Sequence, residues 1–505
     1  MTVNLLATVD LGSNSFRLLI GKINSDGTIV PLDQIKETVR LASGLDAKNN
    51  LTKESQLFAL EVLTRFSERL SNFKKSQVRV VGTSTLRVAN NSAEFITIAN
   101  KALGFPIEVI SGKEEARLIY IGAMHSLAYT TEKRLVIDIG GGSTEFIIGE
   151  GYEPQIMESV TMGCVSYTGR YFTDGQLTEA NFNNAIYAAR SKIQSMEHLF
   201  AEHDWRLAIG TSGTAKTLYD MCVENGLSTQ ISYDGMLQLK KKLIRAKSIK
   251  NIAIAGIKDD RRAVIAGGLS IMLAIFEELG IQEMTIADGS LREGVMYDLM
   301  GRKSDSDLRE VTVVDLKKRY GLDIVQGERV ANLAVYMQSQ LIRPEKTNHE
   351  NRKLLIWACE LYEIGLTISH NDYHKHGAYI LQNSDLAGFS KPEQTIIAEL
   401  VKAHRGSVSK IFLKLRKMYR DKIKTTVVFA LISFRLSVIL NRGRKDFNFI
   451  EVLKVDNVTK SGFSLLMSKE WLTNNPLTLF SLNEEIAQWL PFGYTVKLVG
   501  VKDDN

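Results

Sequence analysis

Cysteine and proline are scarce in this chain. Of its 505 residues only three are cysteine and seven are proline. The cysteines, Cys164, Cys222 and Cys359, are odd in number and lack CxxC spacing, which argues against a disulfide framework and against a zinc site. The few prolines leave little room for disordered linkers. We therefore expect a folded protein of the reducing cytoplasm.

Long apolar runs are absent as well. No apolar segment reaches the roughly 20 residues that a membrane-spanning helix needs. The first residues, MTVNLLATVDLGSNS, carry no basic leader and already include Asp10, so they do not resemble a signal peptide. We expect neither a membrane span nor export by this route, although peripheral contact with a membrane stays compatible with the sequence.

The net charge of +6 is modest, and its placement matters more than its size. Between residues 402 and 424, nine lysines and arginines are opposed by one acid, Asp421. Such a run is typical of a solvated helix face or of a surface for a polyanion, and the sequence leaves both open. We expect no nucleic-acid partner.

A sequence repeat indicates how the first half is organised. One hydrophobic core is excluded at this length, because cores stop growing at roughly 250–300 residues. Apolar runs predict strands at 5–10 and 16–22 around a Gly-Ser turn, and the segment ATVDLGSNSFRLLIG at 7–21 recurs as LVIDIGGGSTEFIIG at 135–149. The repeat predicts two similar α/β domains that face each other, with a ligand between the hairpin tips.

The spacing of apolar residues predicts further elements. In the first half we expect a helix at 53–73 that begins after Thr52, a strand at 78–81 and a helix after Asn91. Later helices are expected at 311–320, 327–341 and 353–363. Apolar and polar residues alternate at 449–455, 462–467 and 494–499, which indicates β-structure in the tail. The expected domains are two α/β domains at 1–125 and 126–303, a helical domain at 304–445 and a small β-containing domain at 446–505.

Two Gly/Ser turns carry the first chemical signal, GSNS at 12–15 and GGGS at 140–143. Their backbone N–H groups can converge on anionic oxygens without interference from Cβ atoms, so phosphate is the expected ligand. Asp10 and Asp138 end the preceding strands, where phosphate would repel a carboxylate unless Mg²⁺ intervenes. Glu145 on the return strand would complete the coordination. The alternative for either aspartate is a carboxylate that caps a turn.

Further candidates lie outside the two turns. Glu114 and Glu115 open a predicted helix, where acids complement the helix dipole, and Glu115 is also placed to activate a water. Two Gly-rich loops at 209–215 and 286–294 each follow a strand and precede a helix, so their N–H groups favour anions. Other candidate phosphate ligands are Gly210, Ser212, Gly213, Arg87 and, more weakly, Arg17 and Arg40. No GxxxxGK[ST] segment occurs, which excludes a P-loop NTPase.

Together these segments closely resemble the exopolyphosphatase and guanosine pentaphosphate phosphohydrolase family, within the actin, heat-shock ATPase and sugar-kinase superfamily. The resemblance rests on DLGSNSF at 10–16, GTSTLR at 82–87, SGKEEAR at 111–117, DIGGGSTE at 138–145, MGCV at 162–165, GTSG at 210–213 and DGSLREG at 288–294. It covers the first three hundred residues. It implies that both α/β domains have the actin-like, ribonuclease H-like fold, with a cleft between them.

The resemblance also implies roles for the matching residues. Glu115 would be the general base that activates water. Asp138 and Glu145 would hold Mg²⁺, and Asp10 would assist through a water. The terminal phosphates would be gripped by Arg87, Asn14, Ser15, Gly141, Gly142 and Ser143.

A second resemblance covers the helical domain. The segments YEIGL at 362–366, HKHGAYILQN at 374–383 and DLAGF at 385–389 are similar to the helical domain of the family's long members, which is related to HD phosphohydrolases. The family usually has His-Glu where this chain has Tyr362 and Glu363, and a working HD site needs His-Asp metal ligands. We therefore expect a non-catalytic domain whose histidines are structural or face anions, namely His370, His374, His376 and His404. Long members are often homodimers.

Within the family, GGGS at 140–143 and ADG at 287–289 are more similar to exopolyphosphatases, so inorganic polyphosphate is the expected substrate. Lys414, Arg416 and Lys417 would then form a cationic track for the chain beyond the active site. Guanosine pentaphosphate is the nearest alternative substrate. More remote alternatives are an ATP-dependent sugar or acyl kinase of the same fold and a nucleotide-sensing module without turnover.

Overall fold

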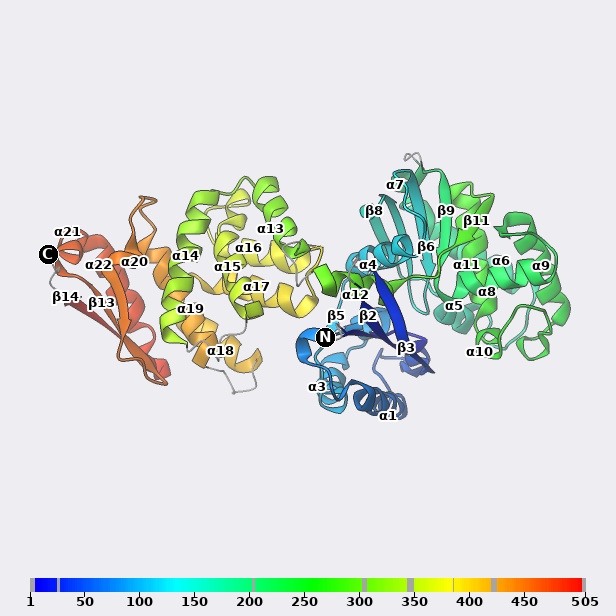
Figure 1. The fold of residues 1–505 in the computed structure, drawn as a ribbon, viewed down its shortest axis with the longest axis horizontal. Helices are drawn as coiled ribbons and strands as arrows, with labels where there is room; N and C mark the ends of the chain where they lie inside the picture. The colour runs from blue at the N-terminus through cyan, green and yellow to red at the C-terminus, as the bar shows by residue number, and fades with distance from the viewer. Residues whose placement is uncertain are drawn as a thin grey trace. The chain divides into compact units, whose positions relative to one another are not determined.

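The computed structural model describes residues 5–24, 28–201, 205–301, 307–342, 349–384, 386–418 and 425–501; the side chains at 201, 349 and 414–418 lie outside this description. The chain forms two compact units, Met1–Leu308 and Arg309–Asn505 (Figure 1). Among the described helices, none combines the length and the apolar character needed to cross a membrane.

The first unit begins with a five-stranded sheet in the order β3-β2-β1-β4-β5. Its strands are β1 (Leu5–Leu11), β2 (Ser15–Ile23), β3 (Ile29–Thr38), β4 (Val78–Gly82) and β5 (Ile107–Val109). The accompanying helices are α1 (Lys53–Leu70), α2 (Ser84–Val88), α3 (Ser92–Leu103) and α4 (Gly112–His125). The predicted hairpin at 5–22 and the helix start at Thr52, whose side chain accepts a hydrogen bond from the N–H of Ser55, are confirmed.

A six-stranded sheet in the order β10-β11-β9-β6-β7-β8 follows in the same unit. Its strands are β6 (Lys133–Ile139), β7 (Thr144–Glu150), β8 (Glu153–Val160), β9 (Leu207–Thr211), β10 (Ile231–Ser232) and β11 (Glu283–Ile286). The helices are α5 (Cys164–Tyr171), α6 (Glu179–Gln194), α7 (Glu197–Ala201), α8 (Ser212–Glu224), α9 (Tyr233–Ala246), α10 (Asp259–Arg262), α11 (Ile265–Leu279) and α12 (Leu291–Gly301). Both sheets contain an antiparallel three-strand meander extended by parallel strands. The repeated hairpin and the two similar α/β halves were predicted from the sequence, whereas the third strand of each meander was not.

The strand register places the candidate acids. Asp10 lies opposite Arg17 in the first hairpin, and Asp138 lies opposite Glu145 in the second. Residues that face each other across two antiparallel strands have neighbouring side chains on the same face of the sheet. The two hairpins therefore present different pairs beside otherwise equivalent loops, an acid with an arginine in one and two acids in the other.

Helices α4 and α12 cross at very short distance because glycines lie at their contact. A Cβ at Gly122 would come within 1.9 Å of the carbonyl oxygen of Ser290, and one at Gly294 within 1.7 Å of that of Leu118. Only residues without a side chain allow such an approach. The crossing brings the second half of α4, at Gly122, against Ser290 in the loop that precedes α12.

The second unit consists of helices followed by a small sheet. The helices are α13 (Leu308–Arg319, whose first residue belongs to the first unit), α14 (Ile324–Leu341), α15 (His349–Glu360), α16 (Tyr373–Asn383), α17 (Lys391–Ala403), α18 (Val408–Met418), α19 (Thr425–Leu440), α20 (Phe449–Val452), α21 (Lys469–Asn474) and α22 (Pro476–Ala487). The strands β12 (Leu453–Asp456), β13 (Gly462–Ser468) and β14 (Thr495–Val501) form the sheet. The alternating segment at 449–455 is thus only partly strand, because it begins with the short helix α20.

One hydrophobic cluster joins the helices of the second unit to its sheet, with Met337, Leu436, Leu465 and Trp489 all buried in it. A buried ion pair reinforces this junction, because Nε of Arg435 lies 2.6 Å from Oε1 of Glu485. The helical and β-containing segments therefore share one core.

Candidate active site

The two hairpin loops of the first unit meet directly. A Cβ at Gly141 would lie 3.1 Å from Cβ of Ser13, and one at Gly142 would lie 2.8 Å from Oγ of Ser84. These distances are at or below the limit of ordinary contact, so side chains at 141 and 142 would push the loops apart. The glycines of the second loop are needed for this close approach.

Both loops turn their carbonyl oxygens away from the space between them. The carbonyl of Asn14 accepts backbone hydrogen bonds of 3.1 and 2.8 Å from the segment at 39–40, and that of Gly141 accepts bonds of 3.0 and 3.2 Å from the segment at 165–166. No described residue accepts a hydrogen bond from the N–H of Gly141 or Gly142. Free N–H groups of successive residues form a concave site for anionic oxygens.

A cavity of about 90 Å³ lies at the meeting point of the loops. It gathers side chains and loop residues from both halves of the first unit, including Asp10, Asn14, Ser15, Arg17, Glu115, Asp138, Gly141, Gly142, Ser143, Glu145, Ser212 and Gly213. The remaining lining includes Ser13, Ser290 and Arg292, which belong to the predicted anion-binding loops, and Ser84 and Arg261, for which the sequence predicted no role. The repeated hairpins therefore build one site.

Some predicted residues lie elsewhere. Gly210 is inside strand β9 and does not line the cavity; a Cβ there would meet Ala215 at 2.7 Å and Met284 at 2.8 Å, so this glycine serves packing. Arg40 is an exposed residue with a φ of 52° before a short helix, also outside the lining. The side chains of Lys414, Arg416 and Lys417 lie outside the described residues.

Four carboxylates line the cavity, those of Asp10, Glu115, Asp138 and Glu145. Glu115, Asp138 and Glu145 are buried, and Oδ1 of Asp10 is buried without a hydrogen-bond partner among the described groups. Burial raises the pKa of Asp10 to about 7, although Arg17 opposes the shift. Burial, together with the charges of Glu115 and Asp138, raises the pKa of Glu145 well above its usual value. Deprotonating all four groups together requires a compensating cation.

Asp138 and Glu145 are each held by hydroxyl groups through one oxygen. Oδ2 of Asp138 accepts hydrogen bonds from Oγ of Ser212 at 2.5 Å and from Oγ of Ser290 at 2.9 Å, and Oε1 of Glu145 accepts one from Ser159 at 2.8 Å. Ser212 has a φ of 65°, a left-handed conformation that is uncommon outside glycine. Each carboxylate is thus oriented by hydroxyl groups, and a further hydrogen bond from Ser143 opposes the rise that burial causes in the pKa of Glu145.

These residues suit a loosely coordinated hard cation. Over the described ranges, no three His, Cys, Asp or Glu side chains are grouped so that they could hold a metal ion. Mg²⁺ does not need such a cage, because it keeps several waters and is usually bound by one or two carboxylates together with substrate phosphates. The pair Asp138 and Glu145 fits this mode. The predicted Mg²⁺ requirement stays a prediction.

Glu115 is fixed by the start of helix α4. The side chain of Ser111 caps the helix by accepting a hydrogen bond of 3.1 Å from the N–H of Glu114. Oε2 of Glu115 accepts a hydrogen bond of 2.6 Å from Nη1 of Arg87, a residue that itself does not line the cavity. Burial raises the pKa of Glu115, and Arg87 opposes this shift.

Glu114 points in another direction. Its two carboxylate oxygens each accept a hydrogen bond of 2.8 Å from Arg117, and Asp298 lies 2.5 Å from the same guanidinium. All three side chains are buried within the first unit. The structure thereby separates two neighbouring acids that the sequence could not, Glu114 in a buried ionic network and Glu115 in the cavity.

Three arginines line the same cavity, Arg17 from β2, Arg261 from α10 and Arg292 from α12. The pKa of Arg17 is lowered by burial and then by the charge of Arg292. Within the described chain no carboxylate forms an ion pair with Arg17 or Arg261. A Cβ at Gly213 would lie 1.6 Å from Nη2 of Arg261, so this guanidinium occupies the space that the glycine leaves open.

A larger compartment of about 720 Å³ adjoins the cavity and shares the three arginines with it. Its walls add Lys36, Lys216 and Lys258, together with the acids Asp220, Asp260, Asp288 and Glu293. The ring of Tyr297 also lines it, stacked on His125 with the ring centroids 3.7 Å apart. The site therefore continues from a small polar pocket into a wider space with mixed charge and an aromatic wall.

This combination of anion-binding loops, acids and arginines between two similar α/β halves defines a phosphate-handling enzyme site of the actin-like fold. Residues 20–303 match the Ppx/GppA phosphatase family, and residues 308–486 match domain III of Ppx/GppA phosphatases. The chain belongs to the Ppx/GppA phosphatase family. The family resemblance predicted from the motifs is confirmed.

Individual relatives agree with this assignment. The chain is 38% identical, over 97% of each chain, to a guanosine-5'-triphosphate,3'-diphosphate pyrophosphatase from Pseudoalteromonas translucida. Its fold is similar to the crystal structure of an exopolyphosphatase from Cytophaga hutchinsonii, with a TM-score of 0.54, 27% identity and coverage of 59% of this chain and 98% of that one. An exopolyphosphatase-like protein, 24% identical and with a TM-score of 0.54, covers 60% of this chain and 99% of its own, and shows similarity of fold alone.

Proposed function

We propose that this protein hydrolyses the terminal phosphoanhydride bond of inorganic polyphosphate. The observation that carries this proposal is the mixture of charges in the cavity, because buried carboxylates and the guanidinium groups of Arg17, Arg261 and Arg292 line one small space. Clustered guanidinium groups repel one another until an anion lies between them, and a chain of phosphates supplies several negative charges at once. The free N–H groups at Gly141 and Gly142 add donors for the terminal phosphate.

Glu115 is the proposed general base. It takes a proton from a water, the water oxygen attacks the terminal phosphorus, and the bond from that phosphorus to its bridging oxygen breaks as the shortened chain leaves. Arg87 holds the carboxylate of Glu115 in place and keeps its pKa from rising further. When bound by Asp138 and Glu145, with Asp10 assisting through a water, Mg²⁺ would neutralise charge on the phosphate oxygens.

Guanosine pentaphosphate is the second candidate substrate, and two observations favour it. The 38% identical relative is named for an activity on a guanosine substrate. The wider compartment offers an aromatic wall at Tyr297 and carboxylates such as Asp260 and Glu293, which suit a nucleoside better than a purely anionic chain. Both substrates would present the same terminal phosphoanhydride to Glu115.

A parallel assay separates these two proposals. Phosphate release is measured from long-chain polyphosphate and from guanosine pentaphosphate, each with Mg²⁺ and with excess chelator. The leading proposal predicts a higher kcat/KM for polyphosphate and loss of both activities without Mg²⁺. A preference for guanosine pentaphosphate would establish the second candidate. Absence of phosphate release from either substrate would contradict both.

A further inference from the structure

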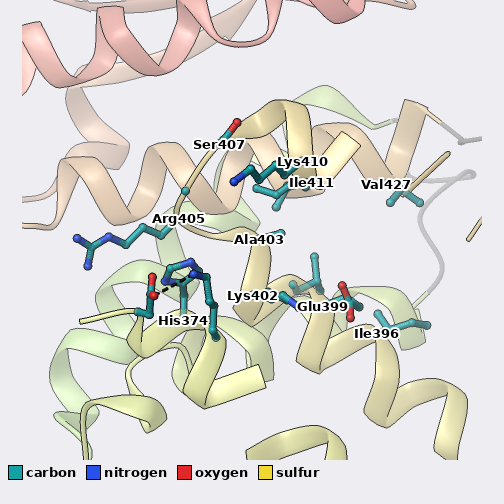
Figure 2. Close-up of a pocket in the computed structure, with 15 residues that line it drawn as sticks. His374, Ile396, Glu399, Lys402, Ala403, Arg405, Ser407, Lys410, Ile411 and Val427 are labelled. Atoms are coloured by element: carbon teal, nitrogen blue, oxygen red, sulfur yellow. Dashed lines mark hydrogen bonds and ion pairs between the residues drawn. The ribbon is translucent and has the colours of Figure 1, made fainter. Parts of the chain in front are cut away.

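A second cavity, of about 310 Å³, lies wholly within the second unit among α16, α17, α18 and α19. Figure 2 shows His374, Lys402 and Ile396 on one side of the open space and Lys410, Ile411 and Val427 on the other. The volume is at the lower end of the range for small-molecule sites, about 300–1,000 Å³. The function proposed above makes no use of this cavity.

The floor of this cavity is aliphatic because two helices turn apolar stripes toward it. Its apolar residues are Ile396, Leu400 and Ala403 of α17, Ile411 of α18, and Val427 and Leu431 of α19. The spacings of four and three along α17, and of four along α19, place these side chains on one face of each helix. No aromatic ring other than the imidazole of His374 lines the described part of the cavity.

Four exposed cations lie at the rim of the opening, Lys375, Lys402, Arg405 and Lys410, and the lining also includes two acids, Asp372 and Glu399. Lys375 forms an ion pair of 2.9 Å with Asp372. In the part of the chain that the structure describes, no carboxylate forms an ion pair with Lys402, Arg405 or Lys410. The guanidinium of Arg405 lies over the ring of Tyr373, 5.2 Å from its centroid, so Lys402 and Lys410 are the cations of the rim that are most available to a ligand.

His374 connects the floor to the rim. The residue is 8% exposed, and its Nδ1 is buried without a hydrogen-bond partner among the described groups. His404, another buried histidine of the same unit, differs because both of its ring nitrogens have partners. Its Nδ1 lies 2.5 Å from the carbonyl oxygen of Val401, and its Nε2 lies 3.1 Å from the hydroxyl of Tyr373. His374 therefore keeps one ring nitrogen without a hydrogen-bond partner among the described groups, which is uncommon for a buried polar atom.

The charges around His374 favour an anion at this place. Burial lowers the pKa of His374, Asp372 raises it, and Arg405, Lys375 and Lys402 lower it again. The imidazole is therefore neutral near pH 7 and carries one N–H that can donate to an anionic oxygen. An anion beside it would also neutralise the surrounding cations.

We propose that this cavity binds a small amphiphilic anion, a carboxylate or phosphate group on a short aliphatic chain. The chain would cover the floor formed by Leu400, Ile411 and Leu431, and the head group would lie among His374, Lys402 and Arg405. Polyphosphate alone would leave the floor exposed to water. A nucleobase would find no extended aromatic face to stack on, and a neutral alkyl chain would leave His374 and the cations unpaired.

The test uses the full-length protein with its histidines labelled with ¹³C, and the His374 resonance is assigned by its loss in His374→Gln. The probes are octanoate and octyl phosphate, with acetate, 1-octanol and tripolyphosphate as comparisons. At least one octyl anion should shift this resonance saturably and raise the pKa of His374, and acetate should bind at least about tenfold more weakly. If 1-octanol or tripolyphosphate moves the resonance as strongly as the octyl anions do, or if neither octyl anion moves it, the proposal fails. Preference between the two octyl anions identifies the head group.

Single substitutions make the assignment specific. Lys402→Gln should weaken octyl-anion binding by about tenfold through loss of charge, and Ile411→Gln by a similar factor through loss of the apolar floor. Lys497→Gln removes an exposed lysine of β14, outside the cavity, and should leave binding unchanged. Unfolding temperatures confirm that the variants are folded. Unaltered binding in both Lys402→Gln and Ile411→Gln would overturn the proposal.

Discussion

Nη1 of Arg87 lies 2.6 Å from Oε2 of Glu115 and 3.1 Å from the carbonyl oxygen of Ile110. One guanidinium thus connects the short helix α2, the end of β5 and the first turn of α4. Arg87 was predicted from the sequence as a direct phosphate ligand, whereas here its visible contact is with the proposed base. We therefore assign Arg87 first to positioning Glu115.

The pH dependence of activity should report this contact. Burial raises the pKa of Glu115, and Arg87 lowers it. Arg87→Gln removes the lowering, so the carboxylate should stay protonated to higher pH, and the acid limb of the kcat/KM profile should move to higher pH. Profiles of phosphate release for the wild type and the variant measure the shift. Arg65→Gln changes an exposed arginine and should leave the limb in place. If the acid limb of the Arg87→Gln profile stays at the wild-type pH or moves to lower pH, Arg87 does not position Glu115 as assigned.

Cation affinity should depend on the hydroxyl groups behind Asp138. Ser212→Ala removes a hydrogen bond that orients this carboxylate, and such indirect contacts are typically worth about 10–100-fold in metal affinity. Glu145→Gln should weaken Mg²⁺ binding further, because it removes one of the two proposed ligands. Calorimetric titration with Mg²⁺ in the absence of substrate measures both effects. Ser195→Ala, at an exposed serine outside the cavity, is the matched control. Equal Mg²⁺ affinity in all four proteins would contradict the proposed ligands.

Without Mg²⁺, the pH dependence of the stability of the folded protein should depend on the raised pKa of Asp10. Its pKa of about 7 in the folded protein exceeds the ordinary value of 3.8, so the folded state binds more protons than the unfolded state between these values. The contribution of this group to stability is therefore lost as pH rises through about 7. The Tm of Asp10→Asn relative to wild type should increase between pH 5 and pH 8 in chelator, as calorimetry can measure. A Tm difference that is constant or shrinks over this range would exclude the raised pKa.

Gly213 and Arg261 should behave as one unit. A methyl group at 213 would occupy the position of the Arg261 guanidinium, whose flexible end can move, so Gly213→Ala should preserve folding and displace the cation. We expect KM for polyphosphate to rise by about tenfold in Gly213→Ala and in Arg261→Gln, and the double variant to be little worse than either. Gly169→Ala, where no atom lies within 4 Å of the added methyl, should be neutral. Additive losses in the double variant would show that the two residues act separately.

The hairpin repeat was predictable because its signal is local. Alternating apolar residues and a Gly-Ser turn determine both hairpins, and the strand register then places Asp10, Asp138 and Glu145 beside the loops. The meeting of the loops was predictable for the same reason, since a repeat of this kind forms two similar domains. The predicted domain boundaries within each unit are not tested by the division into two units.

The contacts between distant segments could not be predicted. Glu114 and Glu115 are adjacent in sequence, and only tertiary structure shows one facing Arg117 and the other Arg87. Arg261 lies in an ordinary charged segment with no motif, and its place over Gly213 depends on a loop almost fifty residues earlier. Gly210 is the opposite case to Arg261. It belongs to a family motif, but in the structure it allows close packing inside β9 and does not line the cavity. The predicted homodimer, the HD-like relationship and the cationic track at Lys414 stay predictions.

The neighbouring acids of α4 provide the most direct test of the central claim. Glu115→Gln should keep the fold and the binding of polyphosphate while lowering kcat for phosphate release by about 10²–10⁴-fold. Glu114→Gln should instead reduce stability by about 3–5 kcal/mol, because it breaks a buried ionic network, and leave kcat of the folded enzyme within a few-fold of the wild type. The decisive measurement is kcat for phosphate release by these two variants at saturating Mg²⁺ and polyphosphate. A Glu115→Gln enzyme with the turnover of the wild type would contradict the account.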